Sequence, residues 1–428
     1  MKKGLKFGMM VFTVAFVLSG CGKDKIPIED YVRTNPATSG MSMIMKSDTG
    51  YYYSTVSGQE MELHYYDVDS GQNIYLCSKP ECRHDGDAFC TATSEKYHVN
   101  SACFYGDSLY LAAVEETEAE YLYKVIRVSA DGSELTEVIT YMTVNKASMN
   151  AIYGGEPAII HRGVMVLPYR LASKDNIQIG VTGTYLYNLT NGELSQLPEL
   201  EYKKLTTGRG RFTGYGDYIY FNTKIDRANT LSRYCLTDGT VEDMELSRTY
   251  VGVFEVMDED TIYYTWSEGR LYEYKISTKE NTQYNDIFID TKVYQSTVGE
   301  YSVQQPYNFS DMITDGTYLY VGDGLEFRES GAGLLGYHVN ENGDYEDIVP
   351  CVHVYDRELK EVAKVEISTK ELVGEYEYFS LAILDGMVYV KTTSTVFVCP
   401  LQEFLKGGQP TFEALYDHQD VEYEKYNQ

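Results

Sequence analysis

Apolar and polar residues alternate with a period of two along most of the chain, and short polar turns interrupt the alternation. The clearest unit is a turn followed by an apolar–tyrosine pair, as in Gly106-Asp107-Ser108-Leu109-Tyr110. This pattern predicts β-strands that begin directly after tight turns. Marker residues at the equivalent position of each unit recur 58, 56, 54, 43, 57 and 69 residues apart: Tyr52, Tyr110, Val166, Tyr220, Tyr263, Tyr320 and Tyr389. The recurrence predicts seven structural repeats, with Val166 in a degenerate copy.

The second half of each repeat contains another hairpin pattern. An alternating strand leads into a turn pair such as Ser70-Gly71, Asp131-Gly132 or Asp238-Gly239, and a further strand follows. Such glycine-containing pairs between alternating segments are typical of β-hairpins. Two hairpins give four strands, the content of one propeller blade. We therefore predict an all-β fold, a single β-propeller over residues 47–428 with seven blades of four antiparallel strands. Helical periodicity is limited to one turn at residues 400–406.

The N-terminus has the pattern of an export signal. Lys2, Lys3 and Lys6 precede twelve mostly apolar residues at 7–18, a run too short to span a bilayer as a stable helix. Leu18-Ser19-Gly20-Cys21 then resembles the lipobox of bacterial lipoproteins. The resemblance implies that residues 1–20 are a signal peptide and that the thiol of Cys21 receives a diacylglyceryl group. The alternative is an ordinary secretory signal followed by a chance cysteine.

Lipidation at Cys21 would decide where the protein works. Two acyl chains, palmitate among them, anchor a protein firmly, whereas a single chain binds reversibly. No later stretch of the sequence has the length of a membrane-spanning helix, so we expect an extracytoplasmic protein held to the membrane through Cys21. Residues 21–46, with Pro27 and Pro36 among mixed polar residues, are predicted to form the tether.

Charge and composition limit the classes of partner that the protein is expected to bind. The chain has 36 basic and 64 acidic residues and a formal charge of −28, and removal of a leader with three lysines leaves −31. Such a surface repels nucleic acid and anionic lipid headgroups. Solubility at a crowded cell surface accounts for the acidity, and binding of cations or a basic partner is the alternative. The 42 tyrosines indicate many half-buried strands, and platforms for sugar stacking are their second interpretation.

A group of metal-ligating residues lies between the first and second repeats. The spacing is Cys77-x4-Cys82-x-His84-x5-Cys90. Three thiolates and one imidazole are the donor set of a closed tetrahedral zinc site, which would hold a loop that has no core of its own. Outside the cytoplasm a disulfide among these cysteines and the nearby Cys103 is the competing interpretation, and free thiols are a third. In either of the first two cases the role is structural.

The remaining cysteines carry no comparable signal. Cys235, Cys351 and Cys399 fall inside strand patterns, where buried and unreactive thiols are expected.

The layout as a whole resembles TolB-like and low-density-lipoprotein-receptor-like propeller domains, and also a family of propeller lipoproteins common in anaerobic gut bacteria. The resemblance covers nearly all of the chain after the signal. Its most specific part is the segment from Leu76 to Asp85, closed by Cys90-Thr91-Ala92. The resemblance implies a lipid-anchored propeller and supplies no activity.

Two functional classes remain. The first is a binding module that presents a propeller face to a glycan, a peptide or an envelope protein, and the second is an extracytoplasmic hydrolase or lyase with a site at the propeller axis. No nucleophile-elbow, zinc-protease or P-loop motif occurs in the sequence, which favours binding without excluding an enzyme. Gly331-Ala332-Gly333-Leu334-Leu335-Gly336 matches a dinucleotide fingerprint but lacks the flanking strand and helix that such a site requires.

Overall fold

The computed structural model describes most of the repeat region. Residues 1–32, which include the signal and Cys21, lie outside the described part, as do residues 324–336 with the glycine-rich fingerprint. The described residues are 33, 38–39, 42–47, 49–57, 60–79, 81–84, 90–93, 96–151, 157–174, 180–197, 212–225, 228–246, 251–266, 270–284, 294–298, 301–305, 312–323, 337–339, 345–347, 351–367, 380–391 and 395–417.

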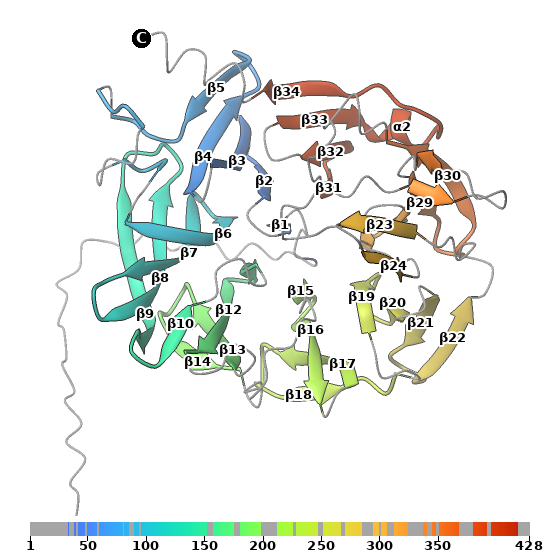
Figure 1. Ribbon diagram of the computed structural model, residues 1–428, viewed down its shortest axis with the longest axis horizontal. Coiled ribbons are helices and arrows are strands. Elements are labelled where there is room, and N and C mark those ends of the chain that lie inside the picture. Colours follow the sequence, from blue (N-terminus) through green and yellow to red (C-terminus); the bar gives the residue numbers. More distant parts are fainter. Residues whose placement is uncertain are drawn as a thin grey trace, which may run out of the picture.

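Seven antiparallel sheets stand around a common axis, as the sequence predicts (Figure 1). In each blade the strands are arranged in chain order, with the first strand nearest the axis and the last at the rim (Figure 1). The protein is therefore an all-β, seven-bladed propeller. The one described helix, α2 (Leu401–Phe404), falls where the sequence predicts a helical turn.

The first four blades come from residues 38–243. Blade 1 contains β1 (Thr38–Ser39), β2 (Ser42–Lys46), β3 (Gly50–Ser57), β4 (Glu60–Asp67) and β5 (Gln72–Tyr75). Blade 2 contains β6 (Tyr97–Tyr105), β7 (Ser108–Glu116), β8 (Glu120–Ser129) and β9 (Leu135–Asn145). Blade 3 contains β10 (Met149–Ala151) and β11 (Ile159–His161), which both pair with β12 (Val164–Ser173), then β13 (Gly180–Asn188) and β14 (Leu194–Gln196). Blade 4 contains β15 (Phe212–Tyr215), β16 (Tyr218–Ile225), β17 (Ala228–Cys235) and β18 (Val241–Asp243).

The last three blades come from residues 251–417. Blade 5 contains β19 (Val251–Val256), β20 (Thr261–Trp266), β21 (Leu271–Lys275) and β22 (Glu280–Tyr284). Blade 6 contains β25 (Met312–Thr314), β26 (Leu319–Asp323), β29 (Cys351–Tyr355) and β30 (Glu361–Glu366). Blade 7 contains β31 (Ser380–Leu384), β32 (Met387–Lys391), β33 (Thr395–Pro400) and β34 (Glu413–Asp417).

Blade 6 is accompanied by a separate four-stranded sheet. Its strand order is β24-β23-β27-β28, with bounds β23 (Tyr294–Val298), β24 (Tyr301–Gln305), β27 (Tyr337–Val339) and β28 (Tyr345–Asp347). The first pair precedes blade 6 in the chain, and the second pair is inserted between β26 and β29. These insertions lengthen the two sequence intervals on either side of Tyr320 without adding a blade.

All seven marker residues are buried and lie in the strand that follows the first tight turn of a blade: β3, β7, β12, β16, β20, β26 and β32. Each packs against the blade that follows it, in one of seven separate hydrophobic clusters. Tyr52, for example, contacts the cluster shared with blade 2, and Tyr320 contacts the cluster shared with blade 7. Val166 takes the equivalent position between blades 3 and 4, so the degenerate copy is a true repeat. The marker therefore recurs at one position of the repeat because it fills the space between neighbouring blades.

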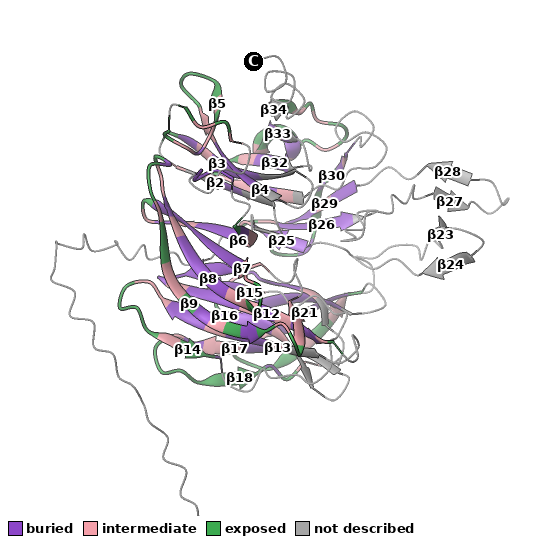
Figure 2. Cartoon of the chain, turned by 60° about the vertical axis from the view of Figure 1, so that its left-hand side comes forward, coloured by how far each residue is buried: buried purple, intermediate pink, exposed green. Residues whose placement is uncertain are grey.

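The ring closes through packing between blade 7 and blade 1. Ile44 and Tyr53 of blade 1 share a cluster with Tyr389 and Val396 of blade 7. Among the described residues, the strands of blade 1 all come from the N-terminal part of the chain and those of blade 7 from the C-terminal part. No strand from one end of the chain pairs within the blade formed by the other end. Figure 2 shows buried residues concentrated on the blade strands and exposed residues at the turns.

The predicted tether is partly incorporated into the propeller. β2 forms the inner strand of blade 1, and the side chain of Ile44 is buried, so the propeller begins before residue 47. β1 pairs with β2 and lies inside the ring of inner strands (Figure 1). Arg33 makes an isolated bridge with Tyr215 of blade 4. Polar composition predicted a solvated linker here, but apolar residues at 43–45 supply a strand and Arg33 supplies a charge that blades 4 and 5 bind.

Among the described residues, no helix is long and apolar enough to cross a membrane.

Candidate metal centre

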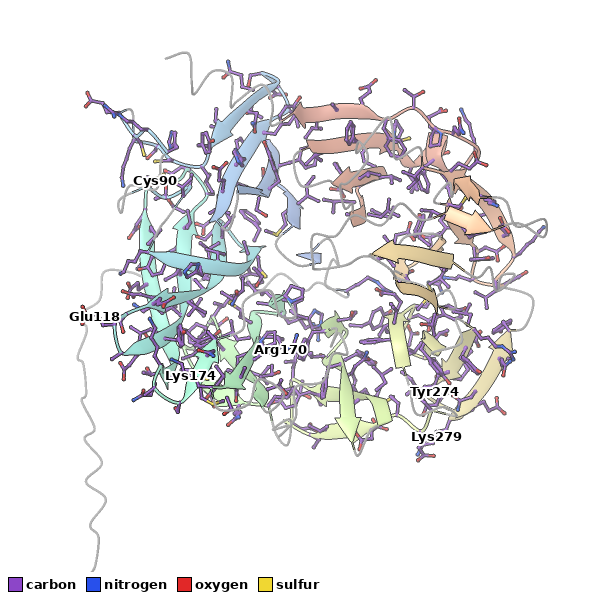
Figure 3. All side chains as sticks on the ribbon, in the orientation of Figure 1. Cys90, Glu118, Arg170, Lys174, Tyr274 and Lys279 are labelled. Carbon is purple, nitrogen blue, oxygen red and sulfur yellow. The ribbon has the colours of Figure 1, made fainter. Side chains whose placement is uncertain are left out.

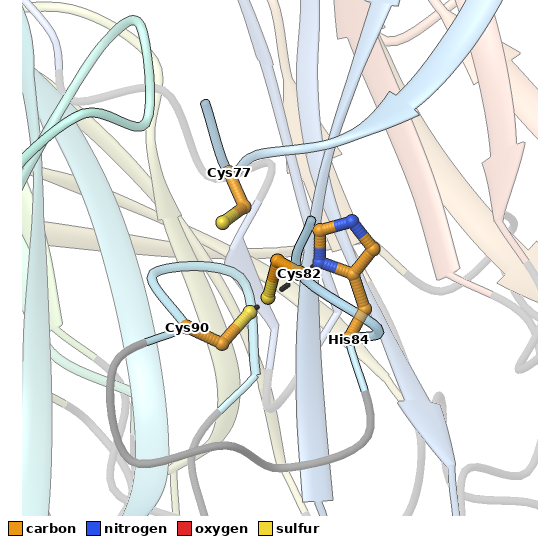
Figure 4. A group of neighbouring side chains, drawn as sticks. All are labelled: Cys77, Cys82, His84 and Cys90. Atoms are coloured by element: carbon orange, nitrogen blue, oxygen red, sulfur yellow. Dashed lines mark hydrogen bonds between the residues drawn. The ribbon is translucent and has the colours of Figure 1, made fainter. Parts of the chain in front are cut away.

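Four predicted ligands meet where the chain crosses from blade 1 to blade 2. The sulfurs of Cys77, Cys82 and Cys90 and a ring nitrogen of His84 all lie within 4.8 Å of one another. Figure 4 shows the three sulfurs and the imidazole turned toward a common centre, and Figure 3 places Cys90 on the outer side of the ring. The group lies in a segment outside the sheets, between β5 and β6. The folded chain thus brings together four residues whose spacing in the sequence only suggested a common site.

The separation of two of the donors matches what a tetrahedral zinc ion needs. The Nδ1 of His84 lies 3.5 Å from the Sγ of Cys90. Zinc bonds of about 2.0 Å to nitrogen and 2.3 Å to sulfur at a tetrahedral angle would separate these two atoms by about 3.5 Å. The donor set therefore fits a closed structural zinc site.

Backbone N–H groups surround the three sulfurs in a repeated arrangement. The N–H two residues further along donates to each sulfur: Lys79 to Cys77, His84 to Cys82, and Ala92 to Cys90. Thr93 adds a second N–H to Cys90, with nitrogen and sulfur 3.4 Å apart. Such bonds stabilise the anionic thiolate, which is the form that ligates a metal.

The pKa values of the three thiols differ, because burial and hydrogen bonds act on each thiol to a different extent. Burial raises the pKa of Cys77 and of Cys90, but hydrogen bonds outweigh it, so both pKa values lie below the ordinary value. At Cys77 these bonds come mainly from backbone N–H groups, and at Cys90 they come from the side chain of Thr93 and from backbone N–H groups. Burial dominates at Cys82 and raises its pKa to about 11. With no charged ligand between them, three close thiols cannot all ionise easily, because each thiolate repels the next.

An aromatic row across blade 1 fixes the ring of His84. The ring stacks on Tyr75 with centroids 4.6 Å apart. Tyr75 ends the outer strand β5 and contacts His64 of β4, whose ring stacks on Tyr53 of β3 at 5.1 Å. The three strand residues are direct cross-strand neighbours. Since the stack holds the imidazole face, its Nδ1 edge is turned to the sulfurs while the backbone of His84 takes a left-handed φ of 54°.

On its other side the cluster segment is attached to blade 2. The hydroxyl of Thr91 lies 2.7 Å from the carbonyl oxygen of Leu76 and 2.8 Å from that of Gly132. The N–H of Ser78 also donates to the carbonyl of Gly132. Gly132 belongs to the turn between β8 and β9, so the cluster connects the rims of two neighbouring blades. A metal bound here would stabilise the first interblade crossing.

The other cysteines lie away from this group. Cys103, which the disulfide interpretation included, is buried between blades 2 and 3, and its thiol donates to the carbonyl of Ala158 at 3.1 Å. Cys235, Cys351 and Cys399 are buried in strands, as the sequence predicts. The seven described cysteines are free thiols in this structure. Four converging donors are what a metal site requires, whereas a disulfide requires only two sulfurs.

Sequence reasoning missed the residues that support the cluster. Tyr75 and His64 belong to the period-two pattern of blade 1, and nothing in their spacing marks them as neighbours of His84. The i+2 N–H donors are backbone groups, which leave no sequence signal. Gly132 was recognised as a turn glycine only, although its second role is close contact with Leu76.

The fold defines the class of this protein as a seven-bladed β-propeller with a Cys3His cluster at its first interblade crossing. No protein-family model and no curated protein matches the chain.

Solved structures of similar shape have low sequence identity. YCF48 bound to D1 peptide is 9% identical, with a TM-score of 0.44 and coverage of 86% of this chain and 94% of that chain. BamB from Moraxella catarrhalis is 11% identical, with a TM-score of 0.39 and coverage of 85% and 95%. The acylaminoacyl peptidase of Pyrococcus horikoshii is 8% identical, with a TM-score of 0.47, and this chain spans 53% of its length. These likenesses bring no activity, ligand or partner to this chain.

Proposed function

We propose that the protein is a lipid-anchored binding module that works outside the cytoplasm, with its lipid on Cys21. The lysines and apolar run before Leu18-Ser19-Gly20-Cys21 support export and lipidation. The closed ring of seven blades supports binding, because loops from every blade meet at its two faces around one axis. A glycan, a peptide or an envelope protein is the expected extracytoplasmic ligand, and the acidic surface argues against nucleic acid.

The convergence of Cys77, Cys82, His84 and Cys90 carries the second part of the proposal, a structural zinc ion. Four protein ligands close the coordination sphere, so zinc here would hold the loop and would leave no position open for a substrate. The ion would stabilise the crossing between blades 1 and 2, which the chain enters from the rim strand β5. Its contribution is to folding of the propeller and not to chemistry at the axis.

Membrane fractionation tests the anchor. The variant Cys21→Ser should leave the membrane fraction, because it lacks the thiol that receives the lipid. Cys235→Ser is the matched control, since its cysteine is buried in blade 4 and the serine hydroxyl keeps a contact with Thr237, which lies 3.0 Å from the sulfur. Retention of the Cys21→Ser variant in detergent-free membranes would contradict the proposal.

A ligand screen tests the binding role. The purified mature chain should bind one class among cell-wall fragments, oligosaccharides and envelope proteins in a saturable way. Turnover of the bound compound would instead indicate the enzyme alternative.

A further inference from the structure

Arg33 lies far in the sequence from the residues that it contacts, and it is docked against blades 4 and 5. Its Nη2 donates to the carbonyl of Met257 at 2.7 Å. Its Nη1 lies 4.0 Å from a carboxylate oxygen of Glu255, whose side chain is fully buried. The guanidinium also lies 5.0 Å from the ring centroid of Tyr215. A planar cation that meets a carboxylate, a carbonyl and an aromatic face in one place is held in a specific position.

The contacts of Arg33 belong to one face of the propeller. Tyr215 ends β15 and Met257 follows β19, so both residues adjoin turns between the first and second strands of their blades. Gly316 lies in the equivalent turn of blade 6, and a Cβ built on it would be 4.0 Å from Nη2 of Arg33. We call this end of the ring the first-turn face.

Turns between third and fourth strands lie on the same face. In blade 2 the N–H of Ala130, after β8, donates to the carbonyl of Asp107, between β6 and β7. The turn at residues 117–119 lies at the opposite end of β7 and β8. Ten residues of β8 separate the two ends by about 33 Å.

The first-turn face is braced by ion pairs between neighbouring blades. Arg162 of blade 3 pairs with Asp217 of blade 4, and Arg357 of blade 6 pairs with Asp258 of blade 5. Arg357 also donates to the carbonyl of Gly316 at 2.6 Å. Arg33 therefore docks onto a frame that its neighbours already hold together.

The docking point limits how far the lipid can lie from this face. Arg33 follows Cys21 by only twelve positions, and a chain of that length reaches at most about 40 Å when fully extended. We propose that Arg33 fixes the N-terminal segment to the first-turn face, so that the lipid on Cys21 holds this face toward the membrane. The opposite face, with the second-to-third strand turns, is then presented to the extracytoplasmic partner. The orientation rests on the lipid anchor proposed above.

Energy transfer to the membrane tests the orientation. The lipidated protein is reconstituted in phosphatidylcholine vesicles that contain an acceptor-labelled lipid. A donor dye is attached through an azide-bearing amino acid at position 133, on the first-turn face, or at position 118, on the opposite face; both positions are exposed. Figure 3 labels Glu118 at the edge of the ring. Transfer should be at least twofold stronger from position 133, and equal or reversed transfer would overturn the proposal.

Arg33→Ala tests the role of the arginine itself. The difference between the two dye positions should shrink, because the segment is released up to β1. Arg357→Ala is the matched control. It also removes a guanidinium on the first-turn face that contacts a carboxylate and a carbonyl, but it should leave the difference in energy transfer between the two dye positions unchanged. An undiminished difference in Arg33→Ala would overturn the assignment to Arg33. Should this variant fold poorly, the two dye positions in the wild-type background still decide the orientation.

Hydrogen exchange separates docking from anchoring. In the unlipidated Cys21→Ser chain, peptides containing Arg33 and Tyr215 should be protected, and Arg33→Ala should make them exchange faster. Equal exchange in both chains would overturn the docking. Failure of the wild-type protein to associate with vesicles would instead overturn the anchor, and with it the orientation, while the exchange result would still decide the docking.

Discussion

The rings of Tyr51 and Tyr389 lie 5.4 Å apart, centroid to centroid, although 338 residues separate them in the chain. Tyr51 belongs to β3 of blade 1 and Tyr389 to β32 of blade 7. The contact is part of the hydrophobic cluster that closes the ring, and it is tilted in the way aromatic pairs prefer. Stability of the whole propeller therefore depends on this seam.

We expect Tyr389→Ala to lower the free energy of unfolding by about 3–5 kcal/mol, because it removes a fully buried ring from the seam. Tyr389→Phe keeps the ring and should cost much less. Urea denaturation of the two variants measures the difference. Equal stability of both variants would mean that blades 7 and 1 are held together elsewhere.

The zinc and disulfide interpretations of the Cys3His cluster predict opposite experimental results. With zinc, the purified protein should carry about one metal ion, and His84→Ala should lower that occupancy. A chelator should lower the melting temperature and expose three reactive thiols, because the loop loses its ligands. Elemental analysis and thiol titration measure these effects, with Cys235→Ser as the control that should keep its metal.

A disulfide would give a different pattern. Mass spectrometry under non-reducing conditions would show two of Cys77, Cys82 and Cys90 linked, and His84→Ala would change little. A metal-free protein without this link would contradict both interpretations.

Gly132 is expected to tolerate substitution less well than other turn glycines. Its φ is +65°, and a Cβ built on it would lie 2.6 Å from the carbonyl carbon of Leu76. Gly71 has a φ of +66°, but the nearest atom to its Cβ is the hydroxyl of Tyr66 at 3.9 Å. Gly71→Ala should cost about 1 kcal/mol from backbone strain alone. Gly132→Ala should cost clearly more and should also weaken metal retention, as thermal melts and elemental analysis would show.

Stability should fall at acidic pH through Glu137. Hydrogen bonds from Lys124, Lys96 and Tyr97 lower the pKa of Glu137 from 4.5 to about 2. A carboxyl whose pKa is lower in the folded state stabilises the fold above the unfolded pKa, and this contribution is lost as pH falls from about 5 to 2. Its side chain is 41% exposed, so screening limits the effect to about 1 kcal/mol.

Glu137→Gln measures this contribution. The stability difference between wild type and variant should be largest near neutral pH and should shrink as the pH falls from about 5 toward 2. Glu118→Gln, in an exposed turn of the same blade, is the matched control for loss of a carboxylate. A difference that is constant with pH would contradict the assignment.

The repeats were predictable because each blade uses the same local chemistry. Strand alternation and turn pairs are decided by nearest neighbours, so Tyr52 and its six equivalents could be aligned from sequence. The degenerate copy at Val166 is recognised because a buried β-branched residue fills the same space as a tyrosine ring. The propeller begins at β2, before residue 47, because β2 pairs with β3 and Ile44 packs against blade 7.

The donor residues of the candidate metal centre could be predicted from the sequence, but the residues that hold them in place could not. Three cysteines and a histidine within fourteen residues are typical of a metal site or a disulfide, so the residue types and their number pointed to zinc or a disulfide. Their convergence depends on Tyr75, which holds His84, and on Gly132, which holds the segment to blade 2. These residues come from three separate parts of the chain.

By itself the sequence determined the all-β class, the seven repeats and the residue types of the candidate metal centre, since all of these are written in residues close together along the chain. The tertiary structure alone decided how the ring closes at Tyr51 and Tyr389, that the four donors face one point, and that Arg33 meets the buried Glu255. The physical reason is common to all three. Packing, metal geometry and a buried charge pair depend on distances between residues far apart in sequence, and only the folded chain sets those distances.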